Sequence, residues 1–272
     1  MNELYSDEYA AKLMTMAHER AADYAAAKPF AYTYFDDFLP LEAAEAALAA
    51  FPEPKEMKWN EFSNQNEKKL AFDKVEKLPA PIRDVMYFLN SRPIVLFLEA
   101  LTGIKGVIPD PYYVGGGLHQ IKPGGHLEVH ADFNWHEEMQ LDRRINLLVY
   151  LNKDWHEEYG GHFELWDREM KGAEAKILPL FNRCAIFSTT DFSFHGHPTP
   201  LSCPPDRKRK SMATYYYSNG RPAEEISDSH STVFKNRPGV VKEAETNGNG
   251  RGFLKSVTPP IVADAVRSLL KK

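Results

Sequence analysis

Short strand-like runs separated by tight turns dominate the chain between residues 107 and 220. The runs are rich in β-branched and aromatic residues, as in RRINLLVYLN and RKSMATYYYS. Glycine and proline clusters divide them at 115–117, 123–125, 159–161 and 202–206. Short strands with a turn after each are typical of antiparallel sandwiches and barrels. We therefore expect a mainly β fold with flanking helices, in which residues 106–220 form the central β domain.

The flanking regions are predicted to differ from this core. Residues 1–105 should supply helices and strands that pack on it, and residues 221–272 a polar C-terminal extension. The expected elements are an amphipathic helix over 6–28, a strand-like run after Pro29, a helix from Leu41 to Phe51, a helix across Ala80 to Leu101 and a short helix in VADAVRSLLKK. Residues 52–77 are polar and poorly periodic, so we expect an exposed loop or lid there.

Composition limits the classes of partner. The chain has 272 residues, 43% hydrophobic and 26% charged, enough to bury a full core, and its net charge is −5. This charge does not favour nucleic acid or an anionic membrane, which leaves a peptide, a protein or a small molecule as the expected substrate. No apolar run is long enough to span a membrane, and two cysteines are too few for a disulfide framework, so we expect a cytoplasmic protein.

The segment GGHLEVHADFN places His130 and Asp132 two residues apart at the end of a predicted strand. Side chains with this spacing leave the same face of a strand and can bind one ion. Two histidines and one carboxylate form the facial triad of non-haem iron oxygenases, which leaves three coordination positions for other ligands. The segment STTDFSFHGHP offers His195 and His197 as the third ligand.

A keto-acid cosubstrate would also need an anchor for its distal carboxylate. Arg209 and Ser211 are two residues apart at the start of RKSMATYYYS, so they share a strand face. Arg209 belongs to the charge run DRKRK, which suits a solvated loop, but the apolar strand that follows carries it into the fold. Tyr150 ends the run RRINLLVYLN, where core packing and contact with a ligand are equally consistent with its position.

These stretches, taken in order, resemble the prolyl 4-hydroxylase-like branch of the Fe(II)- and 2-oxoglutarate-dependent dioxygenases. The resemblance covers roughly residues 30–220 and also includes FDDFLPLEAAEAAL, PGGHLEVHAD, GGHFELWD and NRCAIFSTTDFSFHGHP. It implies a double-stranded β-helix, which is the jelly roll or cupin-like barrel. It also implies hydroxylation of a C–H bond, in a prolyl residue or a small metabolite, with Fe(II), 2-oxoglutarate as cosubstrate and ascorbate as a candidate reductant.

Residue by residue, the resemblance implies that His130, Asp132 and His195 bind iron and that Arg209 binds the distal carboxylate of 2-oxoglutarate. Tyr150 is similar to a family tyrosine that hydrogen-bonds the same carboxylate, and Ser211 is a candidate second donor. Several relatives have a tyrosine just before the proline-glycine turn, whereas this chain has Lys122. An aspartate at position 132 favours hydroxylation over halogenation, because related halogenases have a small residue there.

Two other functions are consistent with the same residues. A cupin-like metal isomerase or ring-cleaving dioxygenase shares the barrel but needs no 2-oxoglutarate. A non-catalytic barrel would only bind its ligand. Near the predicted site, His119, His126 and His197 are candidates for contact with substrate, although a histidine on a surface or in a hydrogen bond is the simpler interpretation of each.

Overall fold

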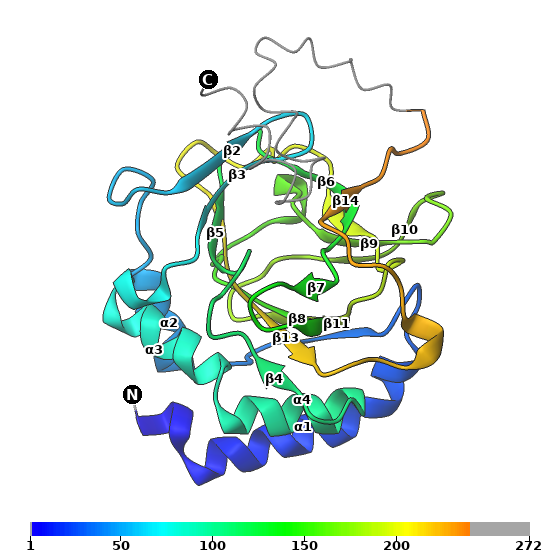
Figure 1. Ribbon diagram of the computed structural model, residues 1–272. Helices are drawn as coiled ribbons and strands as arrows, with labels where there is room; N and C mark the ends of the chain where they lie inside the picture. Colours follow the sequence, from blue (N-terminus) through cyan, green and yellow to red (C-terminus); the bar gives the residue numbers. More distant parts are fainter. Residues whose placement is uncertain (1, 240–272) are drawn as a thin grey trace, which may run out of the picture. The chain divides into compact units, whose positions relative to one another are not determined.

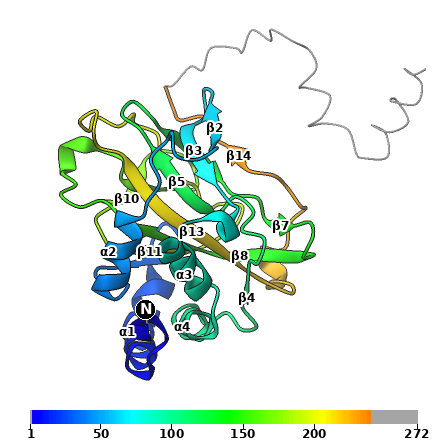
Figure 2. The ribbon, with the colours of Figure 1, turned by 90° about the vertical axis from the view of Figure 1, so that its left-hand side faces the viewer.

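The computed structural model describes residues 2–239, which form two antiparallel sheets with helices on one side (Figures 1 and 2). The larger sheet runs in the order β1 (Tyr32–Phe35), β11 (Cys184–Ser188), β8 (Leu141–Tyr150), β13 (Arg209–Ser218), β5 (Gly117–Ile121), β3 (Lys68–Phe72) and β2 (Asn60–Ser63), with β4 (Ile108–Pro109) beside β13 and β7 (Trp135–His136) beside β8. The smaller sheet runs in the order β10 (Ala173–Ile177), β9 (Phe163–Trp166), β12 (His195–His197), β6 (Leu127–Ala131) and β14 (Val233–Phe234).

The chain alternates between the two sheets after residue 116, and this alternation produces the jelly roll. Strand β5 lies in the larger sheet and β6 in the smaller, and the same alternation recurs from β8 to β9 and from β11 to β12. Phe163 and Leu165 of the smaller sheet share an apolar cluster with Phe187 of the larger sheet, so the inner faces of the sheets pack together. The predicted mainly β fold with flanking helices is confirmed.

The helices cover the outer face of the larger sheet. They are α1 (Asp7–Ala26), α2 (Leu41–Ala49), α3 (Ala80–Leu89) and α4 (Arg92–Thr102), and α1 packs along α4 (Figure 2). Helix α1 begins where Ser6 Oγ accepts a hydrogen bond from the Tyr9 amide, as a helix N-cap does. The first two expected helices and the strand after Pro29 are confirmed, and the helices join Ile145, Leu147 and Val149 of β8 in one core.

Two expected elements differ from the structure. The single helix expected from Ala80 to Leu101 is two helices that separate at Asn90 and Ser91, because Pro93 cannot donate to the carbonyl of residue 89 and its ring would clash there. The expected loop at 52–77 contains the hairpin of β2 and β3, followed by the 3-10 turn η2 (Val75–Lys77). Strand β3 pairs with β5, so this hairpin extends the larger sheet beside the cavity described below.

A β-bulge interrupts the regular alternation of β8. Tyr216 of β13 pairs with Ile145, but the next residue, Tyr217, pairs with Arg143, so Arg144 is an extra residue in β8. One extra residue reverses the face to which the preceding side chains point. Arg143 therefore lies on the same side of the sheet as Asn146 and Leu148, and all three line the cavity between the sheets.

After β13 the chain returns across the smaller sheet. The 3-10 turn η4 (Ala223–Glu225) follows β13, and another 3-10 turn, η3 (Glu157–Tyr159), lies earlier, between β8 and β9. We call residues 226–237, which include β14, the C-terminal strap. The strap pairs with β6, where Phe234 is opposite His130. The helix expected in VADAVRSLLKK lies outside the described residues. None of the helices within residues 2–239 combines the length and apolar character that a membrane crossing requires.

Candidate metal centre

His130, Asp132 and His195 meet at one end of the cavity between the sheets. His130 is in β6, Asp132 directly follows that strand, and His195 of β12 is paired with His130. Their ligand atoms all lie within 4.8 Å of one another. Asp132 Oδ1 is 3.6 Å from His130 Nε2, and Asp132 Oδ2 is 3.5 Å from His195 Nε2. The structure thus brings together the three predicted ligands in a geometry that can hold one metal ion.

Backbone hydrogen bonds select the tautomer of both histidines. His130 Nδ1 lies 2.8 Å from the Glu128 carbonyl oxygen, and His195 Nδ1 lies 2.8 Å from the Ser193 carbonyl oxygen. A carbonyl oxygen only accepts, so each Nδ1 carries the proton and donates it. The lone pair of each neutral ring is then on Nε2, which faces Asp132, and this is the arrangement that metal-binding histidines adopt.

The electrostatic surroundings keep the site in its metal-binding protonation state. Burial, followed by the neighbouring His130, lowers the pKa of His195 to about 4, so the ring is neutral at physiological pH. Burial by itself would raise the pKa of Asp132, but the positive charge of Arg143 is the largest opposing influence, and the pKa lies well below its usual range. A carboxylate beside two imidazoles is the ligand set of a non-haem iron oxygenase.

Arg143 and Asn146 of β8 hold Asp132 from behind. Asp132 Oδ2 accepts hydrogen bonds from Arg143 Nη2 at 3.0 Å and from Asn146 Nδ2 at 2.7 Å, and Arg143 Nε donates to Asn146 Oδ1 at 2.9 Å. The guanidinium also lies over the Tyr215 ring, 3.5 Å from its centroid. Sequence reasoning missed both residues. Asn146 shares the strand face of Leu148, which was a usable signal, but Arg143 reaches the site only because of the bulge at Arg144.

Arg209 lies in the same cavity, which has a volume of about 240 Å³. Its side chain is 5% exposed, its Nε donates to the Gly161 carbonyl oxygen at 2.7 Å, and its Nη2 donates to the Tyr150 hydroxyl at 3.4 Å. Its partners among the described residues include no carboxylate. A buried guanidinium is stable when an anion pairs with it, so the cavity suits an anionic ligand.

Gly161 makes the position of Arg209 possible. A Cβ at residue 161 would lie 2.5 Å from Leu201 Cδ2 and 3.0 Å from Arg209 Cδ, and the residue has a positive φ of 71°. Tyr150 is fully buried and stacks against the guanidinium, with 4.9 Å from Arg209 Cζ to the ring centroid. Ser211 lines the cavity and is paired with Tyr150 in the sheet. Arg209 and Ser211 therefore line one cavity, and Tyr150 contacts the Arg209 guanidinium.

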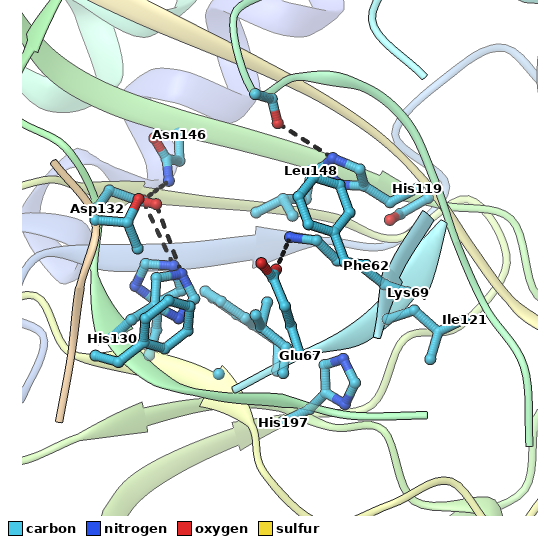
Figure 3. Close-up of a pocket in the computed structure, with 18 of the residues that line it drawn as sticks. Phe62, Glu67, Lys69, His119, Ile121, His130, Asp132, Asn146, Leu148 and His197 are labelled. Atoms are coloured by element: carbon cyan, nitrogen blue, oxygen red, sulfur yellow. Dashed lines mark hydrogen bonds and ion pairs between the residues drawn. The ribbon is translucent and has the colours of Figure 1, made fainter. Parts of the chain in front are cut away.

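Other residues singled out from the sequence occupy different places. His119 and His197 line the cavity, and Figure 3 shows His197 apart from Asp132 and His130. His119 Nε2 lies 3.1 Å from the Gly115 carbonyl oxygen, and burial, followed by the charge of Lys69, lowers the pKa of His119 to about 3. His126 and Lys122 are not among the residues that line this cavity, although His126 Nε2 contacts the Gln65 carbonyl oxygen at 3.4 Å.

The hairpin of β2 and β3 contributes side chains to the same cavity. Glu67 and Lys69 form an ion pair of 2.8 Å, and both side chains are largely buried. Figure 3 shows this pair in the space between the metal ligands and His119, with the Phe62 ring above it. The segment expected to be an exposed loop or lid is therefore a hairpin. It contributes the Glu67–Lys69 ion pair and the apolar ring of Phe62 to the cavity.

The comparisons with known proteins agree with this chemistry. The family model of the 2OG-Fe(II) oxygenase superfamily matches residues 116–217, which include all the residues placed above from His119 to Ser211. The comparison with curated proteins found no match. Among solved structures, a Trichoplax adhaerens prolyl hydroxylase in complex with a peptide fragment of hypoxia inducible factor is 15% identical, with a TM-score of 0.56, over 80% of this chain and 96% of that chain.

Two further structures show the same fold. A Pseudomonas putida prolyl-4-hydroxylase is 15% identical, with a TM-score of 0.51, and covers 75% of this chain and 100% of that chain. HygX from Streptomyces hygroscopicus, solved with nickel and 2-oxoglutarate bound, is 8% identical, with a TM-score of 0.51, over 79% of this chain and 96% of that chain. Residues 116–217 thus match the 2OG-Fe(II) oxygenase superfamily, and the chain has a fold like that of the prolyl 4-hydroxylases.

Proposed function

We propose that this oxygenase hydroxylates a C–H bond of its substrate at an iron(II) ion bound by His130, Asp132 and His195. The observation that carries the proposal is the joint placement of these three residues and Arg209 around one cavity. When bound, iron(II) supplies the activation of dioxygen that is coupled to decarboxylation of 2-oxoglutarate to succinate. The side chains of this chain supply the orientation of that chemistry.

Each residue has a distinct part in this proposal. The guanidinium of Arg209 forms charge-assisted hydrogen bonds with the distal carboxylate of 2-oxoglutarate, and Tyr150 supports the guanidinium from behind. Ser211, on the same strand face as Arg209, offers a hydroxyl to that carboxylate. The apolar side chains of Leu127, Leu148 and Phe163, which also line the cavity, exclude water from the space between the metal ligands and Arg209.

The substrate is proposed to enter from an adjoining groove. A second hollow of about 500 Å³ is lined by Val114, Trp135 and Glu138, and it shares Phe133 and Thr232 with the metal cavity. A groove of this kind can seat a peptide segment or a small molecule while one C–H bond reaches the metal. The peptide bound to the Trichoplax prolyl hydroxylase supports a prolyl residue as the first substrate to test.

The remaining proposals concern partners and location. We propose that the protein acts in the cytoplasm and requires neither nucleic acid nor a membrane surface, which the net charge of −5 supports. A cupin-like metal isomerase or ring-cleaving dioxygenase would not consume 2-oxoglutarate. A non-catalytic barrel would have no reason to keep the triad and Arg209 together in one buried cavity.

The decisive experiment measures succinate with iron(II), 2-oxoglutarate, oxygen and ascorbate, first alone and then with proline-containing peptides and small metabolites. Wild-type protein should release succinate, and a true substrate should increase the rate. His195→Ala should lose bound iron and all succinate release, whereas His197→Ala should keep its iron. Turnover of a substrate without consumption of 2-oxoglutarate would contradict the proposal and favour the isomerase.

A further inference from the structure

His197 is a buried imidazole that has no hydrogen-bond partner within residues 2–239, and it lies in a cavity that suits an anion. It lies on β12 two residues after His195, so both side chains point into the same cavity. Its side chain is 3% exposed, and neither ring nitrogen has a partner among the described residues. Buried polar groups are nearly always paired, so this ring indicates a ligand that completes its hydrogen bonding.

The surroundings of His197 indicate the charge of that ligand. The cationic side chains of Arg209 and Lys69 line the same cavity as His197. Both carboxylates that line the cavity are already engaged, Asp132 with Arg143 and Asn146, and Glu67 with Lys69. Figure 3 shows His197 below this Glu67–Lys69 pair. None of the carboxylates that line the cavity within residues 2–239 is free to accept from His197, so we infer that its partner is an anionic ligand.

We propose that His197 donates a hydrogen bond to the distal carboxylate of 2-oxoglutarate, beside the guanidinium of Arg209. This inference rests on the proposed function, because it assigns a further residue to the same cosubstrate site. A carboxylate has about four lone-pair positions, and a bidentate arginine uses two of them. The imidazole always carries at least one N–H, so it can fill a third position. His197 is thus a cosubstrate-binding residue and His195 a metal-binding one, although they lie two residues apart.

Gly196 allows the short strand β12 to carry both the metal ligand His195 and the proposed cosubstrate-binding residue His197. A Cβ at residue 196 would lie 2.8 Å from the Leu127 carbonyl oxygen and 3.0 Å from the Glu128 carbonyl oxygen, so only glycine allows β12 to approach β6 this closely. At the same point the pairing shifts, with His195 opposite His130 but His197 opposite Leu127. His197 is in this way set beside the apolar wall of the cavity.

The test uses the full chain loaded with Mn(II), without oxygen, and measures the affinity for two keto acids by calorimetry. One is 2-oxoglutarate, and the other is 2-oxopentanoate, which has the same keto-acid head but no distal carboxylate. His197→Leu should weaken 2-oxoglutarate binding at least tenfold, leave 2-oxopentanoate binding and metal content unchanged, and raise the melting temperature, because an unpaired polar ring is replaced by an apolar side chain. His197→Gln, which keeps an N–H donor, should restore part of the lost affinity.

His119→Leu is the matched control. His119 also lines the cavity, but its Nε2 already bonds to the Gly115 carbonyl oxygen. This variant should lower the melting temperature and keep the ratio of the two keto-acid affinities. The inference is overturned if His197→Leu binds 2-oxoglutarate like wild type, or if it loses both keto acids equally. If wild type itself does not prefer 2-oxoglutarate to 2-oxopentanoate, the proposed function fails instead.

Discussion

The two oxygen atoms of Asp132 have different surroundings, and this difference orients the carboxylate. Oδ2 accepts from Arg143 and Asn146, whereas Oδ1 faces His130 Nε2 at 3.6 Å. The protein therefore fixes the plane of the carboxylate through groups that are not themselves metal ligands. Such outer hydrogen bonds commonly set the geometry and affinity of metal sites, so Arg143 and Asn146 are expected to be positioning residues.

The pairing of Asp132 with Arg143 predicts a stability defect as well as a loss of metal. The Arg143 side chain is 1% exposed, so Asp132→Ala leaves a buried guanidinium without its carboxylate. Breaking a buried ion pair in this way costs about 3 to 5 kcal/mol of unfolding free energy. We expect Asp132→Ala to show such a loss in urea denaturation, together with the loss of bound iron.

Asp132→Ala combined with Arg143→Met separates the two effects. The double variant has no buried unpaired charge, so it should recover most of the unfolding free energy while iron binding stays lost. An Asp132→Ala protein that is as stable as wild type would show that the ion pair contributes nothing. One that binds iron normally and still releases succinate would exclude Asp132 as a ligand.

Arg209 predicts a selective effect on the cosubstrate. Removing one partner of a buried charge-assisted pair costs about 2 to 5 kcal/mol of binding free energy. Arg209→Ala should therefore raise the apparent Michaelis constant for 2-oxoglutarate more than tenfold, while the iron content stays normal. Lysine at position 209 should restore only part of the affinity, because it keeps the charge but loses the planar fork. Succinate release measured against 2-oxoglutarate concentration checks this.

Arg207 is the matched control for this substitution. It belongs to the same charge run, but its Nη1 donates to the Lys153 carbonyl oxygen outside the cavity. Arg207→Ala should change the apparent Michaelis constant for 2-oxoglutarate little. A larger effect at Arg207 than at Arg209 would mean that the anchor lies elsewhere.

At the scale of single elements, strand alternation was the reliable part of the sequence analysis. In β8 the two-residue spacing of a strand separates the core-facing Ile145, Leu147 and Val149 from the cavity-facing Asn146 and Leu148. The bulge at Arg144 could not be foreseen, because no residue type there demands one. The hairpin at 52–77 was also missed, since the all-exposed β2 lacks the half-buried alternation that marks a strand.

The C-terminal strap is an element whose attachment can be tested. Arg237 forms two hydrogen bonds with Glu128 of β6, at 3.1 and 3.2 Å, and Phe234 lies 5.4 Å from the His130 ring centroid. The strap also contributes Thr232 and Phe234 to the cavity. The ion pair therefore holds part of the cavity wall in place.

Arg237→Gln should loosen the strap without removing any proposed metal ligand. We expect faster amide hydrogen exchange over residues 230–237. We also expect a higher apparent Michaelis constant for the substrate at unchanged iron content. Lys235→Gln is the control, because Lys235 lies over the Phe194 ring rather than beside a carboxylate. Equal exchange rates in wild type and Arg237→Gln would show that strand pairing alone holds the strap.

At the scale of the whole molecule, the site joins both sheets. His130 and His195 come from the smaller sheet, whereas Asn146 and Arg209 come from the larger one. The sequence analysis identified the proposed ligands because each lies in a short local pattern that resembles a known family. The contact of Arg143 with Asp132 was not predictable, because it depends on the bulge in β8 and on how the two sheets face each other.

This arrangement predicts that ligands stabilise the whole fold. A ligand at 100 times its dissociation constant adds about 2.7 kcal/mol, which corresponds to a rise of roughly 5 to 10 °C in melting temperature for a domain of this size. Mn(II) and then 2-oxoglutarate should each raise the melting temperature of wild type. In His195→Ala neither Mn(II) nor 2-oxoglutarate should raise the melting temperature, and in Arg209→Ala only the rise caused by 2-oxoglutarate should be lost. If Mn(II) still raised the melting temperature of His195→Ala, the ion would bind elsewhere.

The extra residue in β8 has a consequence for how this strand can vary between related proteins. In this sequence Arg143 reaches Asp132 because Arg144 is an extra residue in the pairing with β13, which places Arg143 opposite Tyr217. A related chain without a residue at position 144 would have a regular strand, and the residue directly before Ile145 would then be opposite Tyr217 and on the cavity side. The strand can therefore vary in length at this point, and the arginine equivalent to Arg143 is the one opposite Tyr217, whether or not an extra residue separates it from Ile145.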